Sequence, residues 1–402
     1  MEINKTKLII LSIIIFFVLN NLIWFSVDTL PPAWDQANHM FLASEQHKAL
    51  ATIFDSPESA KNIFRVSYFY PPLFYLTSQP FISVLGFSED HLIYVNFLYQ
   101  VLLIMSMYGI GMLLFANRRI AILASALVCF YPIVFGLSRE YYPDFALLAL
   151  VTCTQFLIIK SFSSSELLWF LLAGISCGFS LLVKPTSIIY LFFPAVLLVP
   201  GHLRRKKDAF PLVLFALIVL SVIVLWYLYS FWDLNRVLLE RFSGITTLMD
   251  KLITKQYVFE SLSWYGSLFV YNMLSPNLYS FFCVGLLLFL IFGISRRRIM
   301  IILFSWFLFP YLFFCAMPGK DSRYILPILP SVAFITIAGI DALPKRYVRN
   351  ILYSILGVIA CIQFYNLSFN MPPYLVREPA ENYFNRHLKR EDWKMREIMR
   401  AL

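Results

Sequence analysis

Apolar segments close to twenty residues long recur along the chain and alternate with short polar stretches. A helix needs roughly 20 apolar residues to cross a hydrocarbon core of about 30 Å, so each segment predicts a membrane span. The pattern therefore predicts an all-α polytopic membrane protein with about eleven spans, at residues 8–27, 92–116, 120–137, 145–159, 167–183, 187–199, 210–231, 278–294, 299–316, 325–340 and 351–368.

Composition agrees with this pattern and excludes a soluble domain. The 402 residues are 60% hydrophobic and only 14% charged, and the mean hydropathy is +0.72. The basic start and apolar run of residues 1–27 also fit a signal peptide. No small-x-small cleavage site follows the run, which favours a retained first helix.

One further apolar stretch, residues 70–85, is ambiguous. It begins with Tyr70-Pro71-Pro72 and is interrupted by Pro80. It fits either a twelfth span or an interfacial helix, and the placement of basic residues decides between these alternatives.

Lys and Arg concentrate in the loops that eleven spans would place on the side of the N-terminus. These loops hold fifteen of the 33 basic residues, whereas the short loops of the other side hold only Arg139, Lys184, Lys320 and Arg323. A twelfth span at 70–85 would move Arg118, Arg119 and every later cluster to the other side. The bias of Lys and Arg toward short cytoplasmic loops therefore predicts that residues 70–85 lie outside, as an interfacial element.

This layout places the long polar segments outside. They are a first loop at residues 28–91, a second at 232–277 and a polar tail. We expect residues 1–345 to form one catalytic module, and residues 346–402 to add the last span and the tail. The net charge of +10 lies mainly in short loops between spans, so no nucleic acid partner is predicted. The six cysteines lie in apolar segments, without metal-ligand or disulfide spacing.

Four polar clusters share the predicted outer side. Asp35 precedes His39 by four residues, so a helix would place both on one face. The other clusters are 138–144, 184–186 and 319–324. Ionisable groups at membrane depth are costly and tend to pair or to line a functional cavity.

Each cluster also has a structural interpretation. The Asp35 helix fits a solvated amphipathic element, and Asp144 fits a helix N-terminus after Pro143. Lys184 and Lys320 can extend to the headgroups. For Arg139 and Glu140, a solvated ion pair is the expectation.

The order of these motifs resembles the GT-C-fold glycosyltransferases that use polyprenyl-phosphate sugars, a family that includes protein O-mannosyltransferases and aminoarabinose transferases. The resemblance covers roughly residues 28 to 330. It rests on Trp34-Asp35-Gln36-Ala37-Asn38-His39, Tyr70-Pro71-Pro72-Leu73-Phe74-Tyr75, Tyr142-Pro143-Asp144, Val183-Lys184-Pro185-Thr186 and Arg323-Tyr324-Ile325-Leu326-Pro327. The family often has two adjacent acids after the first span, whereas Gln36 follows Asp35 in this chain.

The resemblance implies an integral-membrane glycosyltransferase that moves a hexosyl or pentosyl group from a lipid phosphate to a glycan, lipid or protein acceptor. Such a reaction needs a carboxylate to accept the acceptor's proton and fixed cations on the departing phosphate. Asp35 is the expected general base and Asp144 a second acid, and Lys320 with Arg323 would hold the phosphate. The remaining expected substrate-binding residues are His39, Tyr70, Lys184 and Tyr324.

Sequence leaves several alternatives open. A lipid-linked sugar transporter or flippase would use the same charges to line a conduit, and a non-catalytic assembly subunit is a third possibility. No nucleotide-binding fingerprint is present in the sequence. An active site on the outer side has no supply of nucleotide sugars, so its donor would have to arrive in the membrane on a lipid carrier. We expect a multi-pass protein of the inner or plasma membrane with its site on the non-cytoplasmic face. No cofactor or metal ligand is assigned, although a divalent metal stays compatible with the chemistry.

Overall fold

The computed structural model describes residues 2–27, 32, 34–67, 70–164, 166–203, 209–228, 255–292, 297–317 and 320–369. Every regular element in these ranges is a helix. The predicted all-α membrane fold is therefore confirmed. Residues 232–254 of the predicted second loop and the tail from residue 370 lie outside the described ranges, so those two predictions stay predictions.

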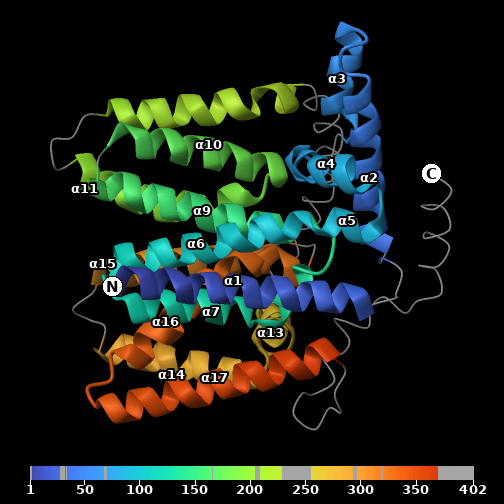
Figure 1. The fold of residues 1–402 in the computed structure, drawn as a ribbon. Helices are drawn as coiled ribbons and strands as arrows, with labels where there is room; N and C mark the ends of the chain where they lie inside the picture. The colour runs from blue at the N-terminus through green and yellow to red at the C-terminus, as the bar shows by residue number, and fades with distance from the viewer. Residues whose placement is uncertain are drawn as a thin grey trace.

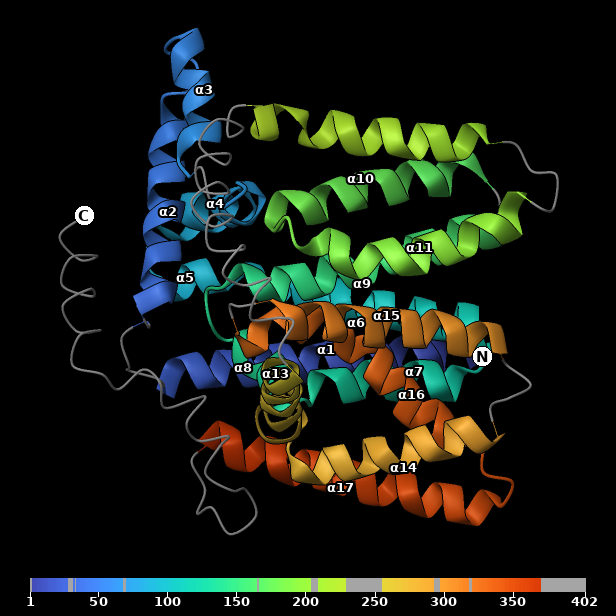
Figure 2. The ribbon, with the colours of Figure 1, turned by 180° about the vertical axis from the view of Figure 1, so that it is seen from behind.

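The long helices run side by side as a single bundle (Figures 1 and 2). α9 and the segment that ends in α16 form its centre: 83% and 89% of their apolar windows are buried, against 6% for the helix Phe210–Leu228. Helices that are apolar on all sides suit both the centre of the bundle and its lipid-facing surface, because the protein core and the lipid accept the same side chains. The bundle comprises α1 (Glu2–Val27), α6 (Val95–Phe115), α7 (Arg118–Cys129), α8 (Pro132–Leu137), α9 (Pro143–Ser164), α10 (Leu167–Val183), α11 (Ser187–Leu203), the helix Phe210–Leu228, α14 (Pro276–Phe292), α15 (Arg297–Ala316), η3 (Ser322–Ile328), α16 (Leu329–Asp341) and α17 (Arg346–Phe369).

As far as the structure describes them, the eleven predicted spans fall mainly on helical residues of this bundle. In the described part of the chain, however, seven helices are long and apolar enough to cross a membrane, or eight if one bent pair counts as a span. The number eleven is therefore not confirmed, because several helices, such as α10 and α11, are shorter than a full crossing.

α14 and α16 approach closely because glycines face each other at their contact. A Cβ atom on Gly339 would overlap the carbonyl of Gly285, and one on Gly285 would lie 2.6 Å from Thr336 Cα. Small residues permit such backbone contact between membrane helices. The pair fixes α16, and with it the η3 segment that precedes it.

A layer of short helices covers one end of the bundle. α2 (Trp34–Ala51) and α3 (Pro57–Arg65) stand across the bundle axis at this end in Figure 1, together with α4 (Leu73–Leu85) and α5 (Glu89–Ile93). The Ser56 hydroxyl caps α3 by accepting from Ser59 N. α4 begins after Pro72 and has thirteen residues, which fits the predicted interfacial element.

A sharp bend joins α13 (Lys255–Leu268) and η1 (Phe269–Leu274) to α14 at the same end of the bundle. The two arms meet at 108°, and Ser275 between them adopts φ 71°. Pro276 then begins α14, in the position where a missing N–H costs a helix least. The bend places α13 beside the ends of α15 and η3.

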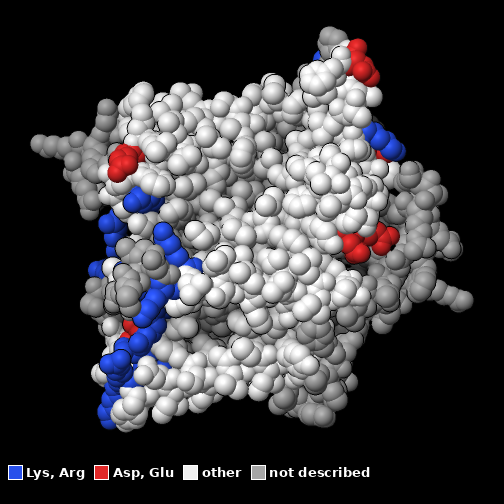
Figure 3. Space-filling model, viewed as in Figure 1, with Lys and Arg blue, Asp and Glu red and all other residues white. Residues whose placement is uncertain are grey.

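Charge is distributed unequally between the two ends. Lys and Arg gather at the end where α1, α7 and α17 begin (Figure 3). The opposite end, covered by α2 to α5, carries the sequence clusters around Asp35, Asp144 and Arg323.

Candidate functional site

An ion pair joins the first polar cluster to the last. Asp35 lies in the first turn of α2, and Arg323 lies near the start of η3. Arg323 Nη1 donates to Asp35 Oδ2 at 2.8 Å. Both side chains keep contact with solvent, with 34% of Asp35 and 20% of Arg323 exposed. The structure thus brings together the predicted base and the predicted phosphate ligand.

Asp321 fixes the other edge of the Arg323 guanidinium. Its Oδ2 accepts from Arg323 Nε at 3.1 Å and from Nη2 at 2.8 Å, and its Oδ1 accepts from Arg323 N at 2.9 Å. Asp321 is therefore both the cap of η3 and a two-point clamp. Sequence analysis assigned it no role, although its place two residues before Arg323 was a capping signal.

A second ion pair lies on α9 and the turn after α10. Lys184 Nζ donates to Asp144 Oδ1 at 2.7 Å, and 3% and 15% of the Asp144 and Lys184 side chains are exposed. The Lys184 ammonium also lies 5.2 Å from the Tyr324 ring centroid. Asp144 is thus a buried, paired carboxylate, which gives it less access to an incoming molecule than Asp35.

Tyr142 and Tyr324 connect the two ion pairs. The Arg323 guanidinium carbon lies 4.8 Å from the Tyr142 ring centroid. Tyr324 directly follows Arg323, and its ring faces Lys184. Cations favour the electron-rich face of an aromatic ring. The two cations therefore rest against tyrosine rings, a combination that suits a partly dry, polar site.

His39 lies beneath this cluster as a neutral imidazole. Its Nδ1 lies 2.8 Å from the Tyr75 hydroxyl, and its ring meets the edges of Tyr70 and Tyr142. Burial lowers the pKa of His39 to about 4, against the opposing attraction of Asp35 and Asp144. At neutral pH His39 therefore acts as a hydrogen-bonding group and not as a cation.

Tyr70 keeps its proton for a similar reason. Burial, followed by the charges of Asp35 and Asp144, raises the pKa of Tyr70 to about 12. A protonated phenol can donate a hydrogen bond to a sugar hydroxyl or a phosphate oxygen. Its ring centroid lies 4.7 Å from that of His39, so both predicted residues belong to one wall of the site.

Lys320 lies at the end of α15. Its Nζ donates to the Cys315 carbonyl at 2.7 Å and lies 5.3 Å from the centroid of the Tyr265 ring. A cation is favourable at a helix C-terminus. Burial lowers the pKa of Lys320. Its described contacts serve the α15 terminus, whereas those of Arg323 serve the Asp35 cluster.

The expectation of a solvated Arg139–Glu140 pair is wrong. Both residues are buried. Arg139 donates from Nε to Asn21 at 2.9 Å and from Nη2 to Asn20 at 2.7 Å and to Ser368 at 3.0 Å. Arg139 therefore joins α1 to the end of α17. The asparagine pair in α1 was the sequence signal for a buried polar partner.

Within the described residues, His, Cys, Asp and Glu do not form any group of three that could hold a metal ion. The geometry instead offers paired carboxylates, cations and phenols at one end of the bundle. Such a set can bind an anion, accept a proton and donate hydrogen bonds to hydroxyl groups.

Comparison with known proteins supports this interpretation of the fold. Residues 70–227 match the family profile of dolichyl-phosphate-mannose-protein mannosyltransferases. A search of curated protein sequences finds no match. The family match includes Tyr70, Asp144 and Lys184 but not Asp35 or Arg323.

Solved structures extend the similarity over most of the chain. ArnT from Cupriavidus metallidurans, solved with undecaprenyl phosphate, is 16% identical with TM-score 0.55, covering 86% of this chain and 63% of its own. The Archaeoglobus fulgidus oligosaccharyltransferase AglB, solved with an inhibitory peptide and a dolichol-phosphate, is 12% identical with TM-score 0.53, covering 94% and 59%. The arabinosyltransferase EmbB from Mycobacterium smegmatis is 12% identical with TM-score 0.51, covering 97% and 40%.

These comparisons define the class of fold. The chain is an integral membrane protein with the fold of the GT-C glycosyltransferases, and the resemblance predicted from its sequence is confirmed. It spans about three fifths of the length of the first two of these structures. The activity, substrates and partners of this chain are therefore inferred from its own site residues and not from these structures.

Proposed function

We propose that this protein transfers a sugar from a polyprenyl-phosphate carrier to a glycan, lipid or protein acceptor. The observation that carries the proposal is the ion pair of Asp35 with Arg323. A carboxylate and a guanidinium in contact supply a proton acceptor and an anion ligand at one point. The fold agrees, since ArnT was solved with undecaprenyl phosphate and AglB with a dolichol-phosphate.

Asp35 is the general base in this proposal. The acceptor hydroxyl or amine attacks the anomeric carbon, the bond from that carbon to the phosphate oxygen breaks, and its electron pair leaves with the phosphate. The acceptor's proton passes to Asp35. Asp35 suits this role better than Asp144, because its side chain is 34% exposed and that of Asp144 only 3%.

Arg323 binds the departing phosphate. Its Nη1 faces Asp35, while Asp321 holds Nε and Nη2. A phosphate that reaches Arg323 therefore competes with Asp35 for Nη1. This exchange releases an Asp35 oxygen at the moment when the donor is bound, and Asp321 keeps the guanidinium plane in place. Donor binding would thus prepare the base for the acceptor.

The site faces the non-cytoplasmic side in this proposal. Lys and Arg collect at the other end of the bundle, which the positive-inside tendency assigns to the cytoplasm. An outward site has no nucleotide supply, which favours a donor carried by a lipid. The partly exposed Tyr70 phenol is suited to binding the transferred sugar, and the buried His39–Tyr75 pair supports it from beneath.

The test is product formation by the purified chain in liposomes with a panel of labelled polyprenyl-phosphate hexoses and pentoses. The double variant Asp35→Asn/Arg323→Gln removes the ion pair without changing the net charge. Its matched control is Glu45→Gln/Lys48→Gln, which removes an exposed pair of 2.8 Å from the same helix. We expect transfer with the wild type and the control, and none with the Asp35/Arg323 double variant.

A transporter or flippase gives a different result. Labelled donor would then change its leaflet without losing its sugar, and the double variant would slow this movement instead of product formation. Such an outcome in the presence of a full acceptor extract would overturn the proposal. The location of both ion pairs at one end favours transfer over a conduit, since transporter sites lie near the bilayer midplane.

A further inference from the structure

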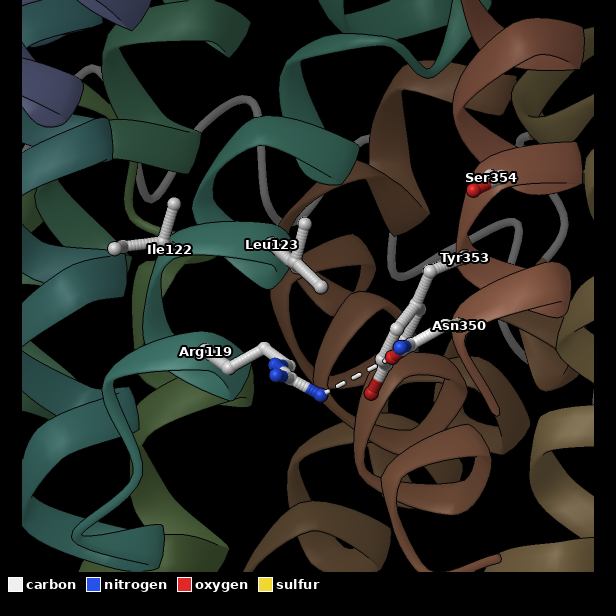
Figure 4. A pocket seen from close by; sticks show the side chains of 6 residues that line it. All are labelled: Arg119, Ile122, Leu123, Asn350, Tyr353 and Ser354. Atoms are coloured by element: carbon white, nitrogen blue, oxygen red, sulfur yellow. Dashed lines mark hydrogen bonds between the residues drawn. The ribbon is translucent and has the colours of Figure 1, made fainter. Parts of the chain in front are cut away.

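A polar pocket lies at the opposite end of the bundle from the Asp35–Arg323 site. It has a volume of about 560 Å³ and lies between α7 and α17 (Figure 4). Its lining combines polar and apolar groups: Arg119, Ile122, Leu123, Asn350, Tyr353 and Ser354. This pocket takes no part in the proposed transfer reaction.

The polar wall of the pocket is suited to an anion. Arg119 Nη1 lies 3.5 Å from Asn350 Oδ1, a long and therefore weak hydrogen bond. The figure shows the Arg119 guanidinium and the Asn350 amide pointing toward each other across the pocket. A phosphate oxygen beside them could accept from the Arg119 guanidinium and from the Asn350 Nδ2 group.

Asp341, an acid that contacts the pocket residue Tyr353, is engaged with other residues. Asp341 accepts from Asn117 Nδ2 at 3.0 Å and from the Tyr353 hydroxyl at 3.3 Å, and Arg349 Nε lies 3.8 Å from it. The charge of Asp341 is therefore partly satisfied by these donors, and Asp341 is not among the residues that line the pocket. Lys and Arg gather at this end of the molecule, so the surroundings of the pocket carry an excess of positive charge (Figure 3).

The pocket also has apolar lining residues, and exposed apolar side chains lie nearby in the sequence of α17. Ile122 and Leu123 follow Arg119 by one turn of α7. On α17, Ile351, Ile355 and Val358 are exposed, as expected of side chains that contact acyl chains. A ligand that satisfies both walls carries an anionic head and an apolar body.

We propose that this pocket binds the phosphate headgroup of an anionic membrane phospholipid. Basic pockets between membrane helices recognise such headgroups, and each Arg near the surface contributes about 1 kcal/mol, or roughly fivefold in affinity. The inference does not depend on the proposed transfer reaction, because the lipid would bind at the other end of the bundle.

The test is native mass spectrometry of the full chain in detergent, with phosphatidylglycerol, phosphatidylcholine or inorganic phosphate added. Arg119→Gln removes the cation, and Asn350→Asp places a carboxylate against the phosphate position. Both residues are at least partly exposed, so folding should be retained, and thermal unfolding without lipid checks this. Arg298→Gln is the matched control, because Arg298 is exposed at the same basic end but does not line the pocket.

We expect phosphatidylglycerol to bind in preference to phosphatidylcholine. Affinity should fall about fivefold in Arg119→Gln, at least as much in Asn350→Asp and not in Arg298→Gln. Equal loss in all three variants would indicate general charge attraction and overturn the site. Wild-type binding by both pocket variants would do the same. Displacement of phosphatidylglycerol by millimolar inorganic phosphate would identify a soluble anion as the ligand and overturn the lipid assignment.

Discussion

Arg323 Nη1 lies 2.8 Å from Asp35 Oδ2, although 288 positions separate the two residues in the chain. The contact joins α2 to η3, the segment that precedes α16. Since α16 is almost fully buried and packs closely at Gly339, the guanidinium has a rigid support, whereas Asp35 belongs to α2, which lies across the end of the bundle. The pair therefore joins a rigid anion ligand to a base on a separate element.

The first prediction concerns the shape of the Arg323 side chain. Arg323→Lys keeps the charge but cannot span Asp35 and Asp321 together. Loss of one hydrogen bond to a charged group costs about 1.5–3 kcal/mol, so kcat/KM for the lipid-linked donor should fall roughly tenfold to hundredfold. Steady-state kinetics in liposomes measures this. Arg298→Lys, at the other end of the bundle, is the control, and equal donor kinetics in both variants would remove Arg323 from phosphate binding.

The second prediction separates stability from chemistry at Asp144. Asp144→Asn leaves Lys184 partly buried without its carboxylate, and breaking a buried pair costs about 3–5 kcal/mol. The thermal unfolding midpoint in detergent should therefore fall clearly.

Removing both charges provides the control for Asp144. Asp144→Asn/Lys184→Met deletes the unpaired ammonium and should recover much of the lost midpoint. If the double variant stays as unstable as Asp144→Asn, the ion pair does not explain the stability of this part of the site.

Sequence patterns predicted the fold better than the site. Hydropathy alone located helical residues at all eleven predicted spans, because lipid imposes a uniform length and composition. It did not give the number of full crossings, since α10 and α11 are apolar but short. The face on which a uniformly apolar helix packs leaves no periodic signal, so the centrality of α9 and α16 appears only in the structure.

Which charged residues pair with each other also could not be predicted from the sequence. Asp35 and Arg323 were each predicted to serve the site, but their contact depends on how α2 folds back over the bundle. Lys320 and Arg323 lie three residues apart and were predicted to act together. In the structure an irregular turn separates them, and Lys320 contacts the end of α15. Local spacing predicts proximity only within a regular helix.

A third prediction uses the pKa of His39. Folded His39 gains its proton only near pH 4, against about 6.5 in the unfolded chain. Between these values the unfolded state binds more protons, so stability falls as pH is lowered, at most by about 1.4 kcal/mol per pH unit. His39→Gln should remove this contribution and flatten the unfolding midpoint between pH 6.5 and 4. The same exchange at His91 is the control, and identical pH profiles for wild type and His39→Gln would contradict a buried neutral imidazole.

The fourth prediction concerns the direction of the protein in the membrane. In a cysteine-free background, Ser56→Cys, in the layer of helices α2 to α5, should react with a membrane-impermeant maleimide added to intact cells. Lys345→Cys, at the basic end, should react only after permeabilisation. Both positions are exposed, so access does not depend on burial. The reverse labelling pattern would place the candidate site in the cytoplasm.

The last prediction identifies the general base. Asp35→Asn preserves the shape of the side chain and can still accept from Arg323, but it cannot take a proton at neutral pH. Turnover at saturating donor and acceptor should fall roughly 10²–10⁴-fold, the range of a lost general base. Donor affinity should be retained or rise, because Arg323 and Asp321 stay in place and a neutral amide competes less with the phosphate for Arg323 Nη1. The partial exposure of Asp35 also predicts a nearly unchanged unfolding midpoint, unlike that of Asp144→Asn.

The comparison of the two variants decides between the acids. Asp144→Asn/Lys184→Met, if its folding is recovered, keeps Asp35 and should retain measurable turnover in the same assay. Should Asp35→Asn instead keep most of its turnover while the stabilised Asp144 variant is inactive, Asp144 is the base. Asp35 would then serve to hold Arg323 until the donor phosphate displaces it, a role that affects KM for the donor more than kcat.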